Sequence, residues 1–469
     1  MLFKKVPVVT AVLLFAALVL VYRSGSRAFL RSTPGSFEYV RKGDDLLDKG
    51  KYREAVGSFE KAYEASPDNR EIKLGLIYAY SKYAASFAEK DDHDRAVEYL
   101  AKAREVLPNA HTGQNLALML ARRSLKRARS GDWAGAITDL REARTLTEGS
   151  AAASRNLGIS LFNDAFGEYK EGREKIAIFL LKGAELAYPD ARILRFIGDI
   201  YYRRNEPETA AFYWARGLAM DPADKTLAED LEKAAKEAGL AASKEKIELP
   251  NFNIVYGRGL SVEIGRVSRI LSGAYMDIGK DLAYFPSAKT TVFFYSEDDF
   301  REIFKVPGAV RAFYDGNIRM PFYRDTADDE ELGRYLYHEY THAVVSAKTK
   351  GNCPVWFSEG IATWEGLKGR EDEAKGSLSG DILPYLSIDA LDRAFKDGAK
   401  DADMRACYIL SYTVVRYVID NWGIGGLRAL LDRMATGQHI ANAIDDEFLM
   451  SEKEFGRRWA EYVRGRYLN

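Results

Sequence analysis

The stretch Tyr335-Leu-Tyr-His-Glu-Tyr-Thr-His-Ala-Val-Val345 carries two histidines four residues apart, His338 and His342, with Glu339 between them. In a helix, these histidines lie one turn apart on the same face, so two neutral imidazoles can converge on one cation. The chain has only 5 histidines in 469 residues, which makes chance a poor account of this spacing. The stretch therefore predicts a zinc site on a helix. The alternative is an ordinary amphipathic helix that happens to carry two histidines.

A second motif, Trp356-Phe-Ser-Glu-Gly-Ile-Ala362, begins fourteen residues after His342. A catalytic zinc site uses three protein ligands and keeps a fourth position open for water. Glu359 is placed to supply the third ligand, which leaves Glu339 free to act as a base. We therefore expect one zinc ion per chain.

Together, these motifs resemble the gluzincin metallopeptidases, specifically the peptidase MA-like domains that bacterial proteins often join to tetratricopeptide repeats. The resemblance covers about residues 250–469, including the strand-like segments 252–256 and 291–295 and a helix at 408–423. It implies an α+β domain that cleaves peptide bonds. The zinc ligands that it implies are His338, His342 and Glu359, and Glu339 would activate water.

A tyrosine on the predicted helix 406–423 is a further candidate for the site. Gluzincins use a phenol from this region to donate a hydrogen bond to the oxyanion of the tetrahedral intermediate. Tyr408 matches that position best, and Tyr412, one turn later, is the substitute. Either residue can instead be a core aromatic. The helix is predicted to end at Gly423.

The segment 315–322 reads as a strand that Pro321 confines to an edge or to the end of its pairing. By the resemblance, the strand at this position binds the substrate backbone by β-augmentation. It lacks the Gly-x-Met-Glu-Asn-type motif that captures a free amine in related aminopeptidases. We therefore expect an endopeptidase acting on a protein or peptide substrate.

Residues 36–222 show an internal repeat that matches tetratricopeptide repeats. Small residues recur where two helices of a repeat approach closely, at Ala55, Ala96, Ala136, Ala177 and Ala210, at intervals of 41, 40, 41 and 33 residues. Because three intervals exceed the usual length of about 34 residues, we expect lengthened first helices in the middle units. About five repeats and a capping helix at 227–240 would form an all-α solenoid, or another helical array of similar architecture. Its concave face is expected to bind a protein partner, and a rigid spacer is the alternative.

Composition narrows the choice of partners. The chain has 68 basic and 69 acidic side chains, and no strongly basic tract predicts a nucleic-acid partner.

The chain's two cysteines, Cys353 and Cys407, are too few for a disulfide framework. They flank segments that must meet at the zinc site, so we expect either one bridge between them or two buried thiols.

The N-terminus contains an uncharged run of seventeen residues, 6–22, flanked by Lys4, Lys5 and Arg23. This is just long enough to span a membrane. We interpret it as an uncleaved anchor, with a cleaved signal peptide as the alternative. We expect a single-pass membrane protein whose catalytic domain is extracytoplasmic, in the periplasm if the source is bacterial.

The predicted organisation is multidomain. An anchor and juxtamembrane segment (1–35) precedes the helical repeats (36–240), a linker (241–249) and an α+β gluzincin-like peptidase domain (250–469). The competing function is a non-enzymatic scaffold or envelope quality-control factor with a vestigial or structural zinc domain. Glu339 argues against this function, because a structural zinc site needs no such carboxylate.

Overall fold

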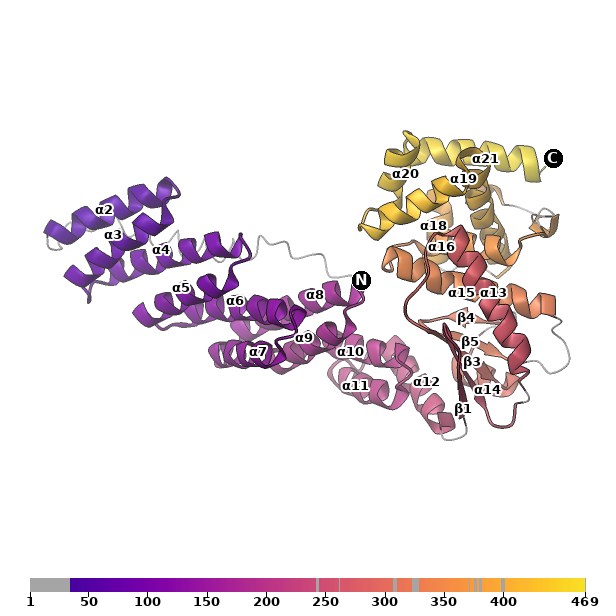
Figure 1. The fold of residues 1–469 in the computed structure, drawn as a ribbon, viewed down its shortest axis with the longest axis horizontal. Coiled ribbons are helices and arrows are strands. Elements are labelled where there is room, and N and C mark those ends of the chain that lie inside the picture. The colour runs from indigo at the N-terminus through magenta and orange to yellow at the C-terminus, as the bar shows by residue number, and fades with distance from the viewer. Residues whose placement is uncertain are drawn as a thin grey trace. The chain divides into compact units, whose positions relative to one another are not determined.

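The computed structural model describes residues 34–241, 244–260, 262–306, 310–322, 329–370, 372–374, 378, 382–397 and 401–468. The chain divides into two compact units, one made of Met1–Ile197 with Arg216–Pro222 and the other of Gly198–Ala215 with Ala223–Asn469. Figure 1 labels the helices and strands of the described residues. The predicted anchor at 6–22 lies outside the described residues. Within those residues, no helix is both long and apolar enough to cross a membrane.

Five consecutive helix pairs fill the described chain from Pro34 to Met220, in the order that the repeat spacing predicts. They are α2 (Pro34–Asp48) with α3 (Tyr52–Ala65), α4 (Arg70–Ala88) with α5 (His93–Val106), α6 (Ala110–Arg129) with α7 (Trp133–Thr147), α8 (Ala151–Lys170) with α9 (Glu174–Ala187), and α10 (Ala191–Arg203) with α11 (Pro207–Met220). The first helices of the three middle pairs have 19, 20 and 20 residues, whereas their partners have 14, 15 and 14. The predicted lengthening of these first helices is confirmed.

Small residues let the helices of a pair approach closely. All five repeat alanines are 0% exposed. Gly43 of α2 leaves room for the ring of Phe59 on α3, because a Cβ at Gly43 would lie 2.6 Å from that ring. The repeat pattern is therefore a packing pattern.

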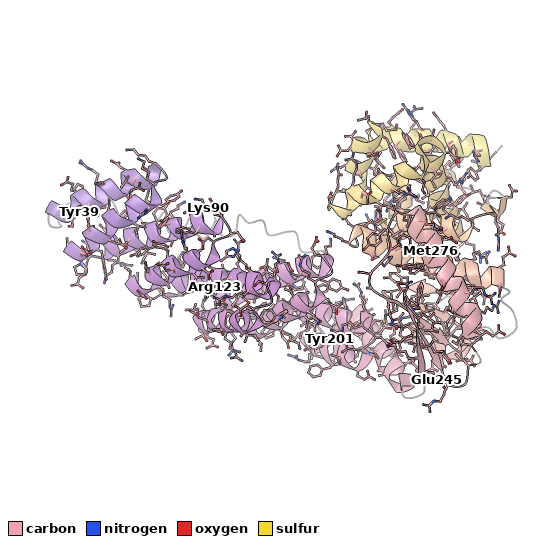
Figure 2. All side chains as sticks on the ribbon, in the orientation of Figure 1. Tyr39, Lys90, Arg123, Tyr201, Glu245 and Met276 are labelled. Atoms are coloured by element: carbon pink, nitrogen blue, oxygen red, sulfur yellow. The ribbon has the colours of Figure 1, made fainter. Side chains whose placement is uncertain are left out.

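An ion pair with a buried carboxylate also joins the two helices of the third pair. Arg123, labelled in Figure 2, lies on α6 and donates two hydrogen bonds to Asp139 of α7, at 3.0 and 2.7 Å. Asp139 is 1% exposed, and Arg127 also donates to it at 3.0 Å. Since the Asp139 carboxylate is fully paired, its burial is compatible with a stable helix pair.

The second unit contains a five-stranded sheet in the order β1-β2-β3-β5-β4, counted over the described residues. The three central strands are parallel and both edge strands are antiparallel to their neighbours. The strands are β1 (Lys244–Glu248), β2 (Phe252–Gly257), β3 (Thr290–Tyr295), β4 (Phe313–Tyr314) and β5 (Ile318–Pro321).

Helices cover both faces of this sheet. On one face, Val292 and Phe294 share an apolar cluster with residues of α13 (Ile264–Asp281) and α15 (Asp329–Thr349). On the other face, Phe293 and Tyr295 pack against α14 (Glu297–Phe304). Neighbouring residues of β3 thus point to opposite faces, as the strand period requires.

The remaining helices complete the core around α15. They are α16 (Val355–Gly366), α18 (Ile388–Asp397), α19 (Asp401–Ala435), α20 (Ile440–Phe448) and α21 (Glu452–Tyr467), with a short 3₁₀ turn, η2, at Leu383–Tyr385. Gly423, with φ 69° and ψ −178°, interrupts α19, which confirms the helix end predicted there. Trp459 of α21 is 0% exposed and donates its indole N–H to Thr413 of α19 at 3.0 Å.

The structure corrects the predicted linker. Residues 244–248 form the edge strand β1, in which Lys246 pairs with Val255 and Ile247 with Ile254. Its run of Lys and Glu resembles a solvated linker, but charged side chains are also what a protected edge strand carries. The predicted boundary near 240 differs too. Helix α12 (Lys225–Ala241), expected to cap the repeats, belongs to the second unit and contacts α14.

The structure also distinguishes the alternatives for the strand that contains Pro321 and for the two cysteines. β5 is not an edge strand, since β4 pairs with Ile318 and Arg319, and Pro321 lies at the end of the strand.

Cys353 and Cys407 are both thiols, so the bridge is not formed. Burial raises the pKa of the half-buried Cys353 thiol, which disfavours its thiolate form.

Two glycines test the close packing in the first unit. We expect Gly43→Ala to destabilise the protein by about 1–3 kcal/mol, because the new methyl group collides with Phe59. Gly57→Ala on α3 is the matched control, since no atom lies within 4 Å of its Cβ position, and we expect it to stabilise by about 0.5–1 kcal/mol. Denaturant unfolding measures both. Equal effects of the two changes would contradict this account.

Candidate metal centre

Two helices bring three candidate ligands to one point. His338 and His342 project from α15, and Glu359 projects from α16. The two Nε2 atoms are 3.3 Å apart, and Oε2 of Glu359 lies 3.3 Å from each of them. These three atoms are the group of possible metal ligands found in the described part of the chain.

This triangle fits a zinc ion. A tetrahedral zinc ion with nitrogen and oxygen ligands at about 2.0–2.1 Å requires neighbouring ligand atoms about 3.3–3.4 Å apart. Burial alone would raise the pKa of Glu359, but His342 and His338 hold it at about 2, so the group is a carboxylate. In the described part of the chain, its buried Oε2 has no hydrogen-bond partner and lies 3.3 Å from Nε2 of each imidazole. Three electron-rich atoms this close need protons or a cation between them, and one cation satisfies all three.

Ser358 sets the orientation of one imidazole. Its hydroxyl lies 2.8 Å from Nδ1 of His342. When Nδ1–H donates to this hydroxyl, the lone pair of Nε2 points to the centre of the triangle, as a metal ligand requires. The sequence motifs did not predict a role for Ser358. Its position directly before Glu359 was the only available signal.

Gly360 explains why α16 can bring Glu359 to this position. A Cβ on Gly360 would lie 2.4 Å from the backbone oxygen of Ser411, so only glycine permits this approach of α16 to α19. Tyr408 lies one turn before Ser411 on α19. The same contact therefore places Tyr408 near the candidate ligands.

Glu339 is buried beside the triangle without belonging to it. It is 6% exposed, and burial raises its pKa to about 7, with Glu359 adding to the rise and His338 opposing it. A cation at the triangle would lower this pKa by favouring the charged form. The protonation of Glu339 therefore depends on whether a cation occupies the triangle.

The structure distinguishes the two candidate tyrosines. Burial raises the pKa of Tyr408, and the charges of Glu359 and Glu339 raise it further, so this phenol lies near both carboxylates and stays protonated. Tyr412 is 1% exposed and interacts electrostatically with Arg416. Tyr408 is thus the phenol next to the site.

The comparisons agree with a peptidase-like domain. Residues 312–465, about a third of the chain, match the Peptidase MA superfamily. No curated protein matches the chain. The chain therefore carries an array of helix pairs followed by a domain that is similar, over residues 312–465, to the Peptidase MA superfamily.

Solved structures give weaker likenesses. A crystal structure of MamA is 20% identical, with a TM-score of 0.22, over 38% of this chain and 94% of that one. The APC/C hetero-tetramer Cut9-Hcn1 is 17% identical, with a TM-score of 0.20, over 47% and 46%. The TPR domain of P58(IPK) is 15% identical, with a TM-score of 0.19, over 92% and 100%. The helical array is therefore defined by the helix pairs themselves and not by these superpositions.

Metal affinity tests the roles of the triangle and of Ser358. We expect about one zinc per chain, and Ser358→Ala should weaken zinc binding about 10–100-fold because the His342 imidazole loses its partner. Glu359→Ala should weaken binding further. Competition with a chromogenic chelator measures the affinity, with Ser346→Ala on α15 as the control. Full zinc affinity in Glu359→Ala would exclude Glu359 as a ligand.

Proposed function

We propose that this chain is a zinc-dependent peptidase of the gluzincin type that cleaves internal bonds of protein or peptide substrates. The observation that carries the proposal is the triangle of His338, His342 and Glu359, with edges of 3.3 Å and Glu339 buried beside it. A purely structural metal site gives no reason to bury an extra carboxylate there.

The residues around the triangle divide the chemistry between them. Zinc bound there would polarise the scissile carbonyl and make water more acidic. Glu339 accepts the proton of the attacking water and passes it to the leaving amine. Its burial favours the protonated form and a bound cation would favour the carboxylate, so both forms are within reach. Tyr408 donates its O–H to the oxyanion that develops on the substrate.

In this proposal, the helical array and the N-terminal segment have roles outside the catalytic step. The helical array would bind a protein partner or substrate on its concave face, as arrays of this kind do. Residues 6–22 would anchor the chain in a membrane, with the catalytic unit outside the cytoplasm. The competing proposal is a scaffold without activity, and the following experiment separates the two.

The role of Glu339 is tested by an isosteric change. We expect Glu339→Gln to keep about one zinc per chain and to lose cleavage, because the amide cannot accept the proton from water. The measurement is digestion of fluorescein-labelled β-casein by the zinc-loaded protein, paired with metal analysis. If neither the parent protein nor the variant cleaves any protein in a proteome-wide comparison, the scaffold function is favoured.

The two tyrosines form a matched pair for a second test. Tyr408→Phe should leave zinc binding intact and lower kcat roughly 100-fold, since one oxyanion donor is lost. Tyr412→Phe should change kcat by about twofold or less, because this ring is part of the core. The opposite result would move the oxyanion role one turn along α19.

A further inference from the structure

A polar pocket of about 420 Å³ lies in the second unit, between the end of α13, the first half of α15 and the end of α16. On α13 it is lined by Asp277, the residue after Met276, which Figure 2 labels. None of the three candidate zinc ligands lines it, so it is separate from the metal centre. Its acidic side chains are Asp277, Asp281, Glu330 and Glu365, and its basic side chains are Lys280, Arg334, Lys368 and Arg370.

Glu365 of α16 is the most deeply buried of these charged groups. Its side chain is 0% exposed, and its Oε2 accepts a hydrogen bond from Lys368 at 2.6 Å. Its Oε1 is also buried and has no hydrogen-bond partner among the described residues. A buried carboxyl oxygen without a donor costs free energy, so a ligand that donates a hydrogen bond to Oε1 would be stabilised there.

Lys368 shows that this pocket holds an ammonium group. Its Nζ donates to Glu365 and also to Asp281 at the end of α13. The same Nζ lies 4.3 Å from the centre of the Trp364 ring, which adds a cation–π contact. One ammonium group therefore serves Asp281 and a single oxygen of Glu365, and the other oxygen is left for a second donor.

Carboxylates outnumber cations around Glu365. Burial raises the pKa of Glu365 to about 7, Lys368 opposes this rise, and the charges of Asp281 and Asp277 add to it. Asp277 accepts a hydrogen bond from the neutral phenol of Tyr337 at 2.8 Å. Three carboxyl groups thus share one ammonium group, which gives this part of the pocket an excess of negative charge.

The arginines of the pocket have acidic partners within the chain. Arg370 forms an ion pair with Glu330 and lies 3.7 Å from Glu373, and Arg334 also lies 3.7 Å from Glu373. An anionic ligand would compete with these carboxylates for the arginines. A cationic ligand at Glu365 meets no such competition, so the pocket favours a cation.

The spacing of the acids favours an organic cation over a bare metal ion. A metal ion with oxygen ligands at about 2.0–2.6 Å holds those oxygens within about 5 Å of one another. Among the described residues, only the zinc triangle brings three such ligand atoms within 4.8 Å of one another, and Asp277, Asp281 and Glu365 do not. An ammonium group on an alkyl chain reaches separate acceptors through separate N–H bonds.

We propose that this pocket binds an organic cation with a primary ammonium group, for which Glu365 and Asp277 are the acceptors beside Lys368. The ligand is a free polyamine or a lysine side chain of a polypeptide, since both present this ammonium group on an alkyl chain. The binding requires neither zinc nor cleavage, so it is independent of the proposed function.

Calorimetric titration of the full chain in a Glu339→Gln background measures binding without turnover. The two amine probes are spermidine and the peptide acetyl-Gly-Lys-Gly-amide, and the same peptide with norleucine in place of lysine lacks the ammonium group. Stronger binding of spermidine identifies a free polyamine as the ligand, and stronger binding of the lysine peptide identifies a polypeptide side chain.

Two variants remove one acidic acceptor each. Glu365→Gln changes the buried group, and Asp277→Asn changes an exposed residue, which we expect to leave folding intact. Glu297→Gln is the control, since it removes a carboxylate from an exposed ion pair on α14, which covers the opposite face of the sheet. Thermal unfolding checks that each variant is folded.

We expect at least one of the two amines to bind with one site per chain, and more tightly than the norleucine peptide. Glu365→Gln and Asp277→Asn should each weaken this binding at least about tenfold, because each removes a charge-assisted hydrogen bond. The control should match the background. Absence of binding by both amines, or unchanged affinity in either acidic variant, would overturn the proposal.

Discussion

Three electron-rich atoms held 3.3 Å apart are the constraint around which the second unit is arranged. Such atoms repel one another unless a cation or protons lie between them, so other contacts must hold α15 and α16 together. The sheet and α13 support α15 through the apolar core. Gly360 lets α16 reach the backbone of α19, and α19 is held in turn by Trp459 through Thr413. The geometry of the triangle is therefore a property of the whole helical layer.

Local signals in the sequence predict the features that depend on local geometry. His338 and His342 lie one helical turn apart, so their convergence follows from helix geometry once the segment is helical. Gly423 ends a helical run because its φ of 69° suits glycine, and the repeat alanines lie where two helices must approach. Which of the two tyrosines, Tyr408 or Tyr412, lies next to the candidate ligands depends instead on how α16 packs against α19. The spacing of residues along α19 could not predict this packing.

Features that depend on contacts between segments far apart in the sequence could not be predicted from local patterns. Lys244–Glu248 is a strand only because β2 offers it a partner, and its charged composition is compatible with a linker. The role of Ser358 depends on the rotation of the His342 ring. The contact of α12 with β5 runs through Glu237 and Arg319, which are 82 residues apart in the chain. In each case, the deciding contact joins segments that no local pattern connects.

The short strand β5 combines two constraints: apolar packing on one face and the pairing of the buried Arg319 on the other. On one face of β5, Ile318 and Met320 need only apolar neighbours, which many registers of the strand would supply. On the other face, Arg319 needs a carboxylate at Glu237, a hydroxyl at Tyr295 and a second carboxylate at Asp315. A shift of two residues would keep apolar side chains on the apolar face but leave a buried cation unpaired, which is strongly unfavourable. The charged face therefore specifies the register, while the apolar face supplies the burial that stabilises it.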